Sequence, residues 1–165
     1  VMRYLICLLA AAGWVWGEDT SVPLFTIEKS SNANRVQYEA RLKPDGHIDP
    51  KQPVVAYWVM AAEDGRRQDL NLLERAKAYG FTLRQDGIDS YKLRVVSHPN
   101  KEIHVFRDGA AVRAEAVIGG KVARVEKIHI QMRKSFLLSL PDFGEMFGFD
   151  KQTGEKRYEK VLRTE

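Results

Sequence analysis

The chain has 165 residues, with 26 Lys and Arg against 22 Asp and Glu, so its formal net charge is +4 at pH 7. Because the basic residues are interspersed with acidic ones and form no stripe, we expect no nucleic-acid partner. Cys7 is the one cysteine, which excludes an intramolecular disulfide framework and a thiolate zinc site.

The N-terminal segment has the pattern of a secretory signal peptide. Arg3 precedes an apolar run over residues 4–16, and Gly17 separates that run from two acidic residues. The run is shorter than the roughly 20 apolar residues that a membrane-spanning helix requires. Cys7 lies inside the run instead of after it, which argues against a lipid-modified cysteine. We therefore expect residues 1–17 to be cleaved as a signal peptide, with cleavage after Gly13 as the alternative.

Cleavage leaves residues 18–165, which contain no cysteine. A chain of this length can bury enough apolar surface to fold as one domain without disulfides. We expect that domain to be exported to the periplasm or cell envelope of a bacterium, with no transmembrane segment after signal cleavage.

The first part of this domain alternates predicted strands with loops. Residues 24–28 and 36–42 predict a hairpin, and the second of these strands alternates apolar and polar residues. Three prolines exclude regular structure from residues 43–53. Residues 54–60 are apolar throughout and show no alternation, so we expect both faces of this strand to be covered.

One helix is predicted, over about residues 69–79. Asp69 is a suitable N-cap, and apolar residues recur after it at helical spacing. Gly80 stands where a glycine in the left-handed conformation commonly ends a helix. We expect this helix to pack on the sheet and to cover one face of the strand over residues 54–60.

The remainder of the chain predicts one strand after another. Asp-Gly and Gly-Gly pairs separate alternating runs, which is the sequence pattern of β-hairpins. The predicted strands cover residues 81–84, 91–96, 102–107, 112–118, 122–132 and 157–162, with a less regular segment over residues 143–149. Because a long meander leaves exposed edges unless it curls up, we predict a mainly β fold. Its architecture is an antiparallel meander that closes into a barrel or a two-layer sandwich, with the one helix packed on it.

The motifs of several enzyme and cofactor classes are missing. No Gly-x-Ser-x-Gly occurs, and Gly119-Gly120-Lys121 lacks the spacing of a phosphate-binding loop. The loop around His47 lacks the further acidic positions of a calcium site. We therefore predict no metal and no cofactor, and the sequence identifies no catalytic residue.

Polar and aromatic side chains gather around the predicted strand over residues 54–60. Tyrosine and tryptophan combine a large apolar face with a polar tip, which suits the wall of a ligand pocket. The same residue types also suit core aromatics, turn caps and an ion pair that holds the helix on the sheet. The candidates for a binding site at the junction of sheet and helix are Tyr38, Arg41, Tyr57, Trp58, Asn32, Asn34, Glu74 and Arg75.

Five motifs together carry a resemblance to a known family. They are Ile27-Glu-Lys-Ser-x-Asn-x-Asn34, Val36-x-Tyr38, Pro53-Val-x-Ala-Tyr-Trp58, Leu73-Glu-Arg-x-x-Ala-Tyr-Gly80 and Phe147-Gly-x-Asp-x-x-Thr-Gly-Glu-x-x-Tyr158. With them the chain resembles an uncharacterised bacterial family of exported proteins, known only as a domain of unknown function. The likeness covers nearly all of residues 18–165. It implies one intact domain and a bacterial source, and it implies no activity, cofactor or catalytic residue.

Three functions are compatible with these observations. We favour a non-catalytic binding module for a small amphipathic ligand or an envelope partner, because a barrel of about eight strands is wide enough to hold one small ligand. The alternatives are an envelope structural or interaction protein with a filled core, and a hydrolase that acts on envelope carbohydrate or peptide. A pocket bounded by Tyr38, Tyr57 and Trp58 favours the binding module, whereas two convergent carboxylates favour the hydrolase.

Overall fold

The structure is a computed structural model that describes residues 20–134 and 139–162. The predicted signal peptide over residues 1–17 lies outside the described residues. Within the two described ranges, no helix has the length and apolarity that crossing a membrane requires.

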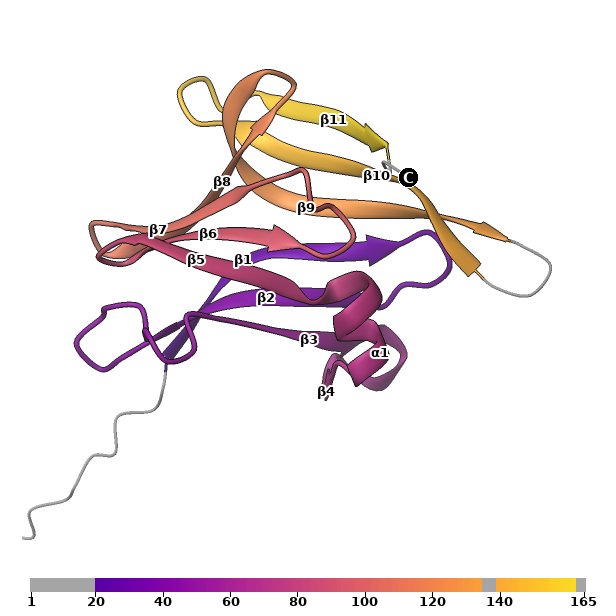
Figure 1. The fold of residues 1–165 in the computed structure, drawn as a ribbon, viewed down its shortest axis with the longest axis horizontal. Coiled ribbons are helices and arrows are strands. Elements are labelled where there is room, and N and C mark those ends of the chain that lie inside the picture. Colours follow the sequence, from indigo (N-terminus) through magenta and orange to yellow (C-terminus); the bar gives the residue numbers. More distant parts are fainter. Residues whose placement is uncertain (1–19, 135–138, 163–165) are drawn as a thin grey trace, which may run out of the picture.

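The described residues form eleven strands of a single curled sheet (Figure 1). The strands are β1 (Thr20–Lys29), β2 (Arg35–Leu42), β3 (Val54–Met60), β4 (Arg66–Asp69), β5 (Phe81–Gly87), β6 (Ser90–Val95), β7 (Ile103–Asp108), β8 (Ala111–Ile118), β9 (Lys121–Lys134), β10 (Ser139–Asp150) and β11 (Lys156–Leu162). Their order across the sheet is β4-β3-β2-β1-β9-β8-β7-β6-β5, and β10 and then β11 follow on the other edge of β9. The prediction of a mainly β fold is therefore confirmed.

The long strand β9 joins the two parts of the sheet. One of its edges pairs with β8 over residues 121–124 and with β1 over residues 127–130, while β10 pairs along the other edge. The pairing of β1 with β9 is parallel, so the prediction of a wholly antiparallel meander is wrong at this point. Ile27 of β1 and Ile128 of β9 are opposite each other and are both fully buried, so the parallel pairing places them in one core.

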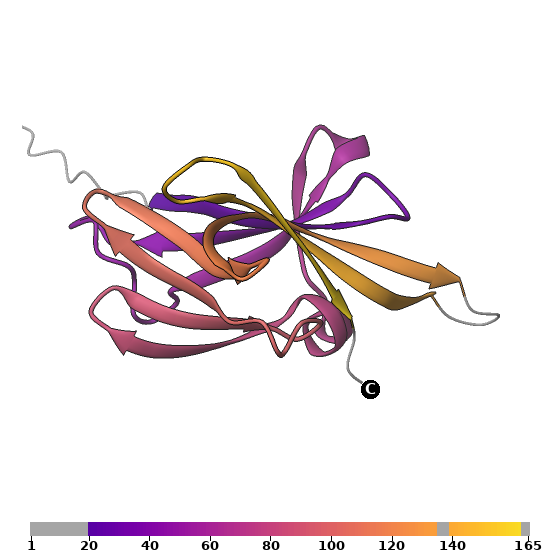
Figure 2. The same ribbon diagram turned by 90° about the horizontal axis from the view of Figure 1, so that it is seen from above.

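The sheet is a half-barrel with two wings, β1–β4 and β5–β8, which face each other (Figures 1 and 2). Among the described strands, β4 and β5 each have a partner on one side only. This curled sheet lies between the two predicted architectures, because the wings face each other as sandwich layers do but belong to one continuous sheet.

The inner faces of the two wings share an apolar core. On β2, Val36, Tyr38 and Ala40 are fully buried, as the alternating pattern predicted. The ring of Tyr38 stacks on Phe25 with the ring centroids 4.5 Å apart, and its hydroxyl donates to the Tyr79 carbonyl at 2.6 Å. Side chains therefore fill the interior of the half-barrel around Tyr38.

The helical segment is shorter than predicted and begins later. Residues 66–69 are the extended strand β4, and Asp69 pairs with Tyr57 on β3 instead of capping a helix. Helix α1 spans only Leu72–Glu74 and continues in the wider turn η2 over Arg75–Tyr79. Pairing with the edge of β3 thus overrides the helical signal at residue 69, which local spacing could not reveal.

The true N-cap of this segment is Asn71. Its Oδ1 accepts the Glu74 backbone N–H, and Glu74 Oε2 accepts the Asn71 backbone N–H, each at 2.9 Å. Gly80 follows the last turn with a φ of −65°, so it is not in the predicted left-handed conformation. A Cβ at Gly80 would lie 1.9 Å from the Arg75 carbonyl oxygen, so close approach of the backbone requires the glycine.

The segment over residues 143–149 forms a strand, and its less regular character is a register shift against β9 between Phe147 and Gly148. It belongs to β10, which pairs with both β9 and β11. A Cβ at Gly148 would lie 2.3 Å from the Arg124 carbonyl oxygen, and one at Gly144 would lie 1.7 Å from Nε2 of His98. The glycines therefore mark the places where β10 passes close to its neighbours.

The loop over residues 43–53 closes one end of the half-barrel. Ile48 in this loop is only 2% exposed, and its N–H donates to Oδ1 of Asp89 at 2.8 Å. The second Asp89 oxygen lies 2.5 Å from Nδ1 of His47 and 3.7 Å from Nη1 of Arg107. Since Asp89 lies in the turn between β5 and β6, these contacts tie the first wing to the second.

His98 is buried where the loop between β6 and β7 meets β10. It is 6% exposed, its Nδ1 lies 2.9 Å from Oγ of Ser97, and its other edge lies against Gly144. Burial lowers the pKa of His98 to about 4, because an imidazolium would lose its hydration at this position.

We expect His98 to make the protein less stable as the pH falls. The unfolded chain takes up a proton on this residue near pH 6.5 and the folded chain only near pH 4, so unfolding is favoured progressively between these values. The lowered pKa corresponds to about 3 kcal/mol at the acid end of the window. Urea denaturation from pH 7 to pH 4 should show this loss in the wild type and a flatter profile in His98→Asn, which keeps a partner for Ser97. Equal slopes in the two proteins would contradict the assignment.

Candidate functional site

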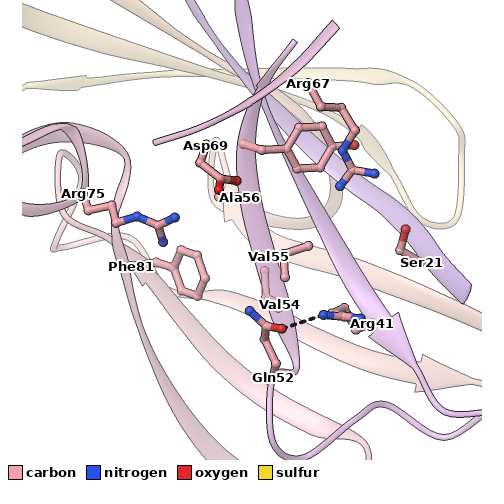
Figure 3. Close-up of a pocket in the computed structure, with 11 residues that line it drawn as sticks. Ser21, Arg41, Gln52, Val54, Val55, Ala56, Arg67, Asp69, Arg75 and Phe81 are labelled. Carbon is pink, nitrogen blue, oxygen red and sulfur yellow. Dashed lines mark hydrogen bonds between the residues drawn. The ribbon is translucent and has the colours of Figure 1, made fainter. Parts of the chain in front are cut away.

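A pocket of about 550 Å³ lies in the slot between the two wings (Figure 3). It surrounds the edge of β3 beyond the end of β4, and the first residue of β5 contributes to the opposite wall. Its lining residues are Ser21, Arg41, Gln52, Val54, Val55, Ala56, Tyr57, Arg67, Asp69, Arg75 and Phe81. We call this pocket the arginine slot.

Three guanidinium groups from three different elements surround the arginine slot (Figure 3). Arg41 of β2 donates to the Gln52 side chain at 2.7 Å, and Arg75 of η2 donates through Nε to the Leu70 carbonyl at 3.0 Å. Arg67 of β4 lies over the ring of Tyr57, with Cζ 3.5 Å from the ring centroid. Asp69 is the one carboxylate in the lining, so the charged groups of the slot are predominantly basic.

The buried carboxylate of Glu39 contacts both Tyr57 and Arg67. Glu39 is 8% exposed and accepts hydrogen bonds from the hydroxyls of Tyr57 at 2.6 Å and of Ser21 at 2.7 Å. Nη2 of Arg67 lies 3.6 Å from the same carboxylate. Burial, helped by the bond to Glu39, raises the pKa of Tyr57 to about 12, so this phenol stays protonated. The Arg67 guanidinium is therefore held between a neutral ring and a negative charge.

The inner wall of the slot is apolar. Val54 and Ala56 of β3 point into the core side, and Phe81 at the start of β5 lies across from them (Figure 3). Phe81 also packs against Tyr38, with ring centroids 5.9 Å apart, so this wall is continuous with the core. The slot thus combines guanidinium groups with an apolar surface, which is the arrangement that an anion with an apolar part requires.

The structure brings three of the eight predicted site residues into this pocket, namely Arg41, Tyr57 and Arg75. Trp58, Asn34 and Glu74 line a separate hollow of about 150 Å³ together with Lys29. Tyr57 and Trp58 point to opposite faces of the sheet, and β4 pairs with β3 at Trp58, whereas the slot lies beyond the end of β4.

The remaining predicted residues have structural roles. Tyr38 is completely buried, and its hydroxyl donates a hydrogen bond to the Tyr79 carbonyl. Asn32 accepts the N–H of Asn34 at 3.1 Å, and Asn34 in turn accepts the N–H of Ala61 at 3.0 Å, so both cap turns. No described cavity is bounded by Tyr38, Tyr57 and Trp58 together.

Sequence reasoning missed Arg67, Asp69 and Phe81 as pocket residues. Arg67 stands in a mixed-sign run that is typical of a solvated surface. It reaches the slot because β4 pairs with β3 in the register that sets Arg67 opposite Val59, on the same face as Tyr57. No local sequence signal indicates this register.

A serine, a histidine and a carboxylate meet elsewhere, on β5, β6 and β7. Oγ of Ser90 lies 2.6 Å from Asp86 Oδ1 and 2.8 Å from His104 Nε2. In a catalytic triad the carboxylate bonds the other ring nitrogen and thereby orients the base. Here Asp86 bonds the serine itself, and this bond lowers the pKa of Asp86, which makes it a poor base. The cluster therefore has the contacts of a turn and not those of an activated nucleophile.

The described residues contain no group of three or more His, Cys, Asp or Glu side chains placed to hold a metal ion. The geometry of the arginine slot points in the same direction, because cationic groups dominate it. Guanidinium groups favour an anion as the ligand of this slot.

The chain belongs to a protein family described as a domain of unknown function, DUF4833, whose model matches residues 25–160. The expected resemblance to an uncharacterised family is thereby confirmed. The matched range includes every residue of the arginine slot except Ser21. Neither the curated proteins nor the solved structures include a significant match to this chain.

The hydrogen bond from Tyr57 to Glu39 should contribute measurably to stability. Tyr57→Phe removes a donor from a buried carboxylate, so we expect a loss of about 1–3 kcal/mol in the free energy of unfolding. Tyr158→Phe is the matched control, because the Tyr158 hydroxyl donates to Glu145 at 2.9 Å on an exposed surface. That variant should lose less than about 0.5 kcal/mol. Urea denaturation of both variants measures the difference, and equal losses would refute a special role for the Glu39 cluster.

Proposed function

We propose that the protein is an exported, non-catalytic binding module of the bacterial cell envelope, and that the arginine slot holds its ligand. The ligand is a small amphipathic anion or the anionic part of an envelope partner. One observation carries the proposal: Arg41, Arg67 and Arg75 surround a pocket whose inner wall is apolar.

The chemistry of the slot suits a carboxylate or a phosphate. Guanidinium groups bind both anions through paired hydrogen bonds, and such charge-assisted bonds are stronger than neutral ones. Tyr57 and Glu39 already hold Arg67, so binding costs little side-chain ordering there. The volume of about 550 Å³ lies within the range of small-molecule pockets.

A hydrolase is less well supported by the same groups. Glu39 already accepts two hydroxyl hydrogen bonds and Tyr57 stays protonated, so neither is placed to act as a general base at neutral pH. Asp69 is the one carboxylate in the lining, whereas glycoside hydrolysis commonly uses two. The filled core agrees with a structural protein, but a purely structural role does not explain the arginine slot.

Export is supported by the segment over residues 1–17, in which Arg3 precedes a short apolar run. When the full chain is produced in a Gram-negative host, the mature protein should appear in the periplasmic fraction. Its intact mass should correspond to a first residue of Glu18. Leu8→Arg, placed inside the apolar run, should keep the uncleaved protein in the cytoplasm. An uncleaved wild-type chain in the cytoplasm would refute export.

Binding can be tested with octanoate, which joins one carboxylate to an apolar chain, and with octyl glucoside as a neutral amphiphile. We expect calorimetry to detect octanoate and not octyl glucoside. The double variant Arg67→Ala/Arg75→Ala should bind octanoate at least tenfold more weakly, because it loses two charge-assisted contacts.

The matched control for this experiment is Arg66→Ala/Lys77→Ala, which removes the same charge from the same two elements outside the slot. Its affinity for octanoate should stay within twofold of the wild type. If both double variants lose the same affinity, net charge and not the slot is responsible, and the proposal fails. If only the slot variant loses affinity, native mass spectrometry of the protein purified from its own envelope would identify the natural anion.

A further inference from the structure

The edge of β3 is open inside the arginine slot. β4 pairs with residues 57–60 of β3 and stops at the pair of Asp69 and Tyr57. No other described strand lies along residues 54–56 on that side. Both faces of this edge line the slot, since Val54, Val55 and Ala56 all belong to the lining. The slot therefore contains three residues of unpaired strand edge.

The backbone groups of this edge point into the slot. The Arg41 N–H donates to the Pro53 carbonyl at 3.1 Å, on the side of β3 that faces β2. Backbone groups of an antiparallel ladder alternate in direction, so residues 53 and 55 bond β2. Val54 and Ala56 then direct their polar groups to the other side. A row of backbone groups that no strand pairs with is a template for an additional strand.

The two faces of the edge differ in chemistry. On the outer face lie Tyr57 and Arg67, which the register of β3 and β4 sets on the same side. On the inner face lie Val54, Ala56 and, across the slot, Phe81. A strand added here would present alternate side chains to a guanidinium group and to an apolar wall.

We propose that the slot binds an extended peptide segment of another polypeptide, in which acidic and apolar residues alternate. The segment adds to β3 as an antiparallel strand that continues the line of β4. Its apolar side chains face Val54 and Ala56, and its acidic side chains face Arg67. This inference rests on the proposed function, because it names the anionic partner of the same slot. Main-chain hydrogen bonds supply affinity and the alternating side chains supply specificity, as in other cases of strand addition.

The probe is an acetylated and amidated hexapeptide of alternating valine and glutamate. In an antiparallel pair, residues directly opposite share a face, and every second such pair exchanges both backbone hydrogen bonds; on this edge of β3 these are the pairs at Val54 and Ala56. The valines, which face Val54 and Ala56, therefore supply the N–H groups that bond β3. N-methylation of the two central valines should weaken binding at least tenfold, whereas N-methylation of two glutamates should change it less than twofold. Both peptides keep all charges, and fluorescence anisotropy with labelled peptides measures the affinities.

The contribution of charge is tested on the protein. Arg67→Ala should weaken binding of the unmodified peptide at least tenfold, and Arg66→Ala, one residue earlier on β4, should stay within twofold of the wild type. A peptide whose two N-methylated forms bind equally well overturns strand addition. Octanoate binding that depends on Arg67, without any binding of the peptide, also overturns it but leaves the proposed function standing.

If neither octanoate nor the hexapeptide binds, both the proposed function and strand addition are overturned. A second copy of this chain is the remaining candidate for the edge of β3. Analytical ultracentrifugation of the free protein tests it by measuring the oligomeric state. A monomer agrees with an open edge. A dimer that binds no peptide overturns the proposal.

Discussion

The parallel pairing of β1 with β9 is the constraint on which the rest of the structure depends. It joins residues 26–29 of the first strand to residues 127–130 of the long strand β9, about a hundred residues later in the chain. The Ser30 N–H donates to the Ile130 carbonyl at 3.2 Å, and Lys127 bridges to Glu28 at 3.0 Å. Since β8 occupies the other part of the same edge of β9, this pairing sets the two wings face to face. The slot between them is a consequence of that arrangement.

The two ends of the slot are held by different means. At one end, Ile48 and His47 bond Asp89 across the wings. At the other end, the Tyr38 hydroxyl bonds the Tyr79 carbonyl and places η2, with Arg75, beside the edge of β3. Both contacts are between residues far apart in the sequence. The guanidinium groups therefore sit on a framework that packing and hydrogen bonds hold rigid, which suits a binding site more than a flexible loop would.

The candidate site could be predicted from the sequence only in part. Tyr57 and Trp58 were correctly placed on a buried strand, but their adjacency does not say which of them faces a pocket. Period two sends them to opposite faces, and the curl of the sheet decides that Trp58 packs on Tyr79 while Tyr57 meets Glu39. Arg67 was not recognisable, because its position depends on the short strand β4, whose four residues are all exposed and polar. Exposed polar residues carry no hydrophobic period by which a strand can be recognised.

The sequence by itself determined most of the strand content, most turn positions and the apolar faces, because alternation and Asp-Gly or Gly-Gly pairs act over a few residues. It also determined the family, whose model matches residues 25–160. Only the tertiary structure decided the parallel β1–β9 pairing, the later start of the helix at Leu72, the open edge at Val54–Ala56 and the meeting of the arginines. The physical reason is that pairing between distant strands is selected by the burial of the whole core. The free energy of that burial depends on contacts between residues far apart in the chain, so a short window of the sequence does not determine it.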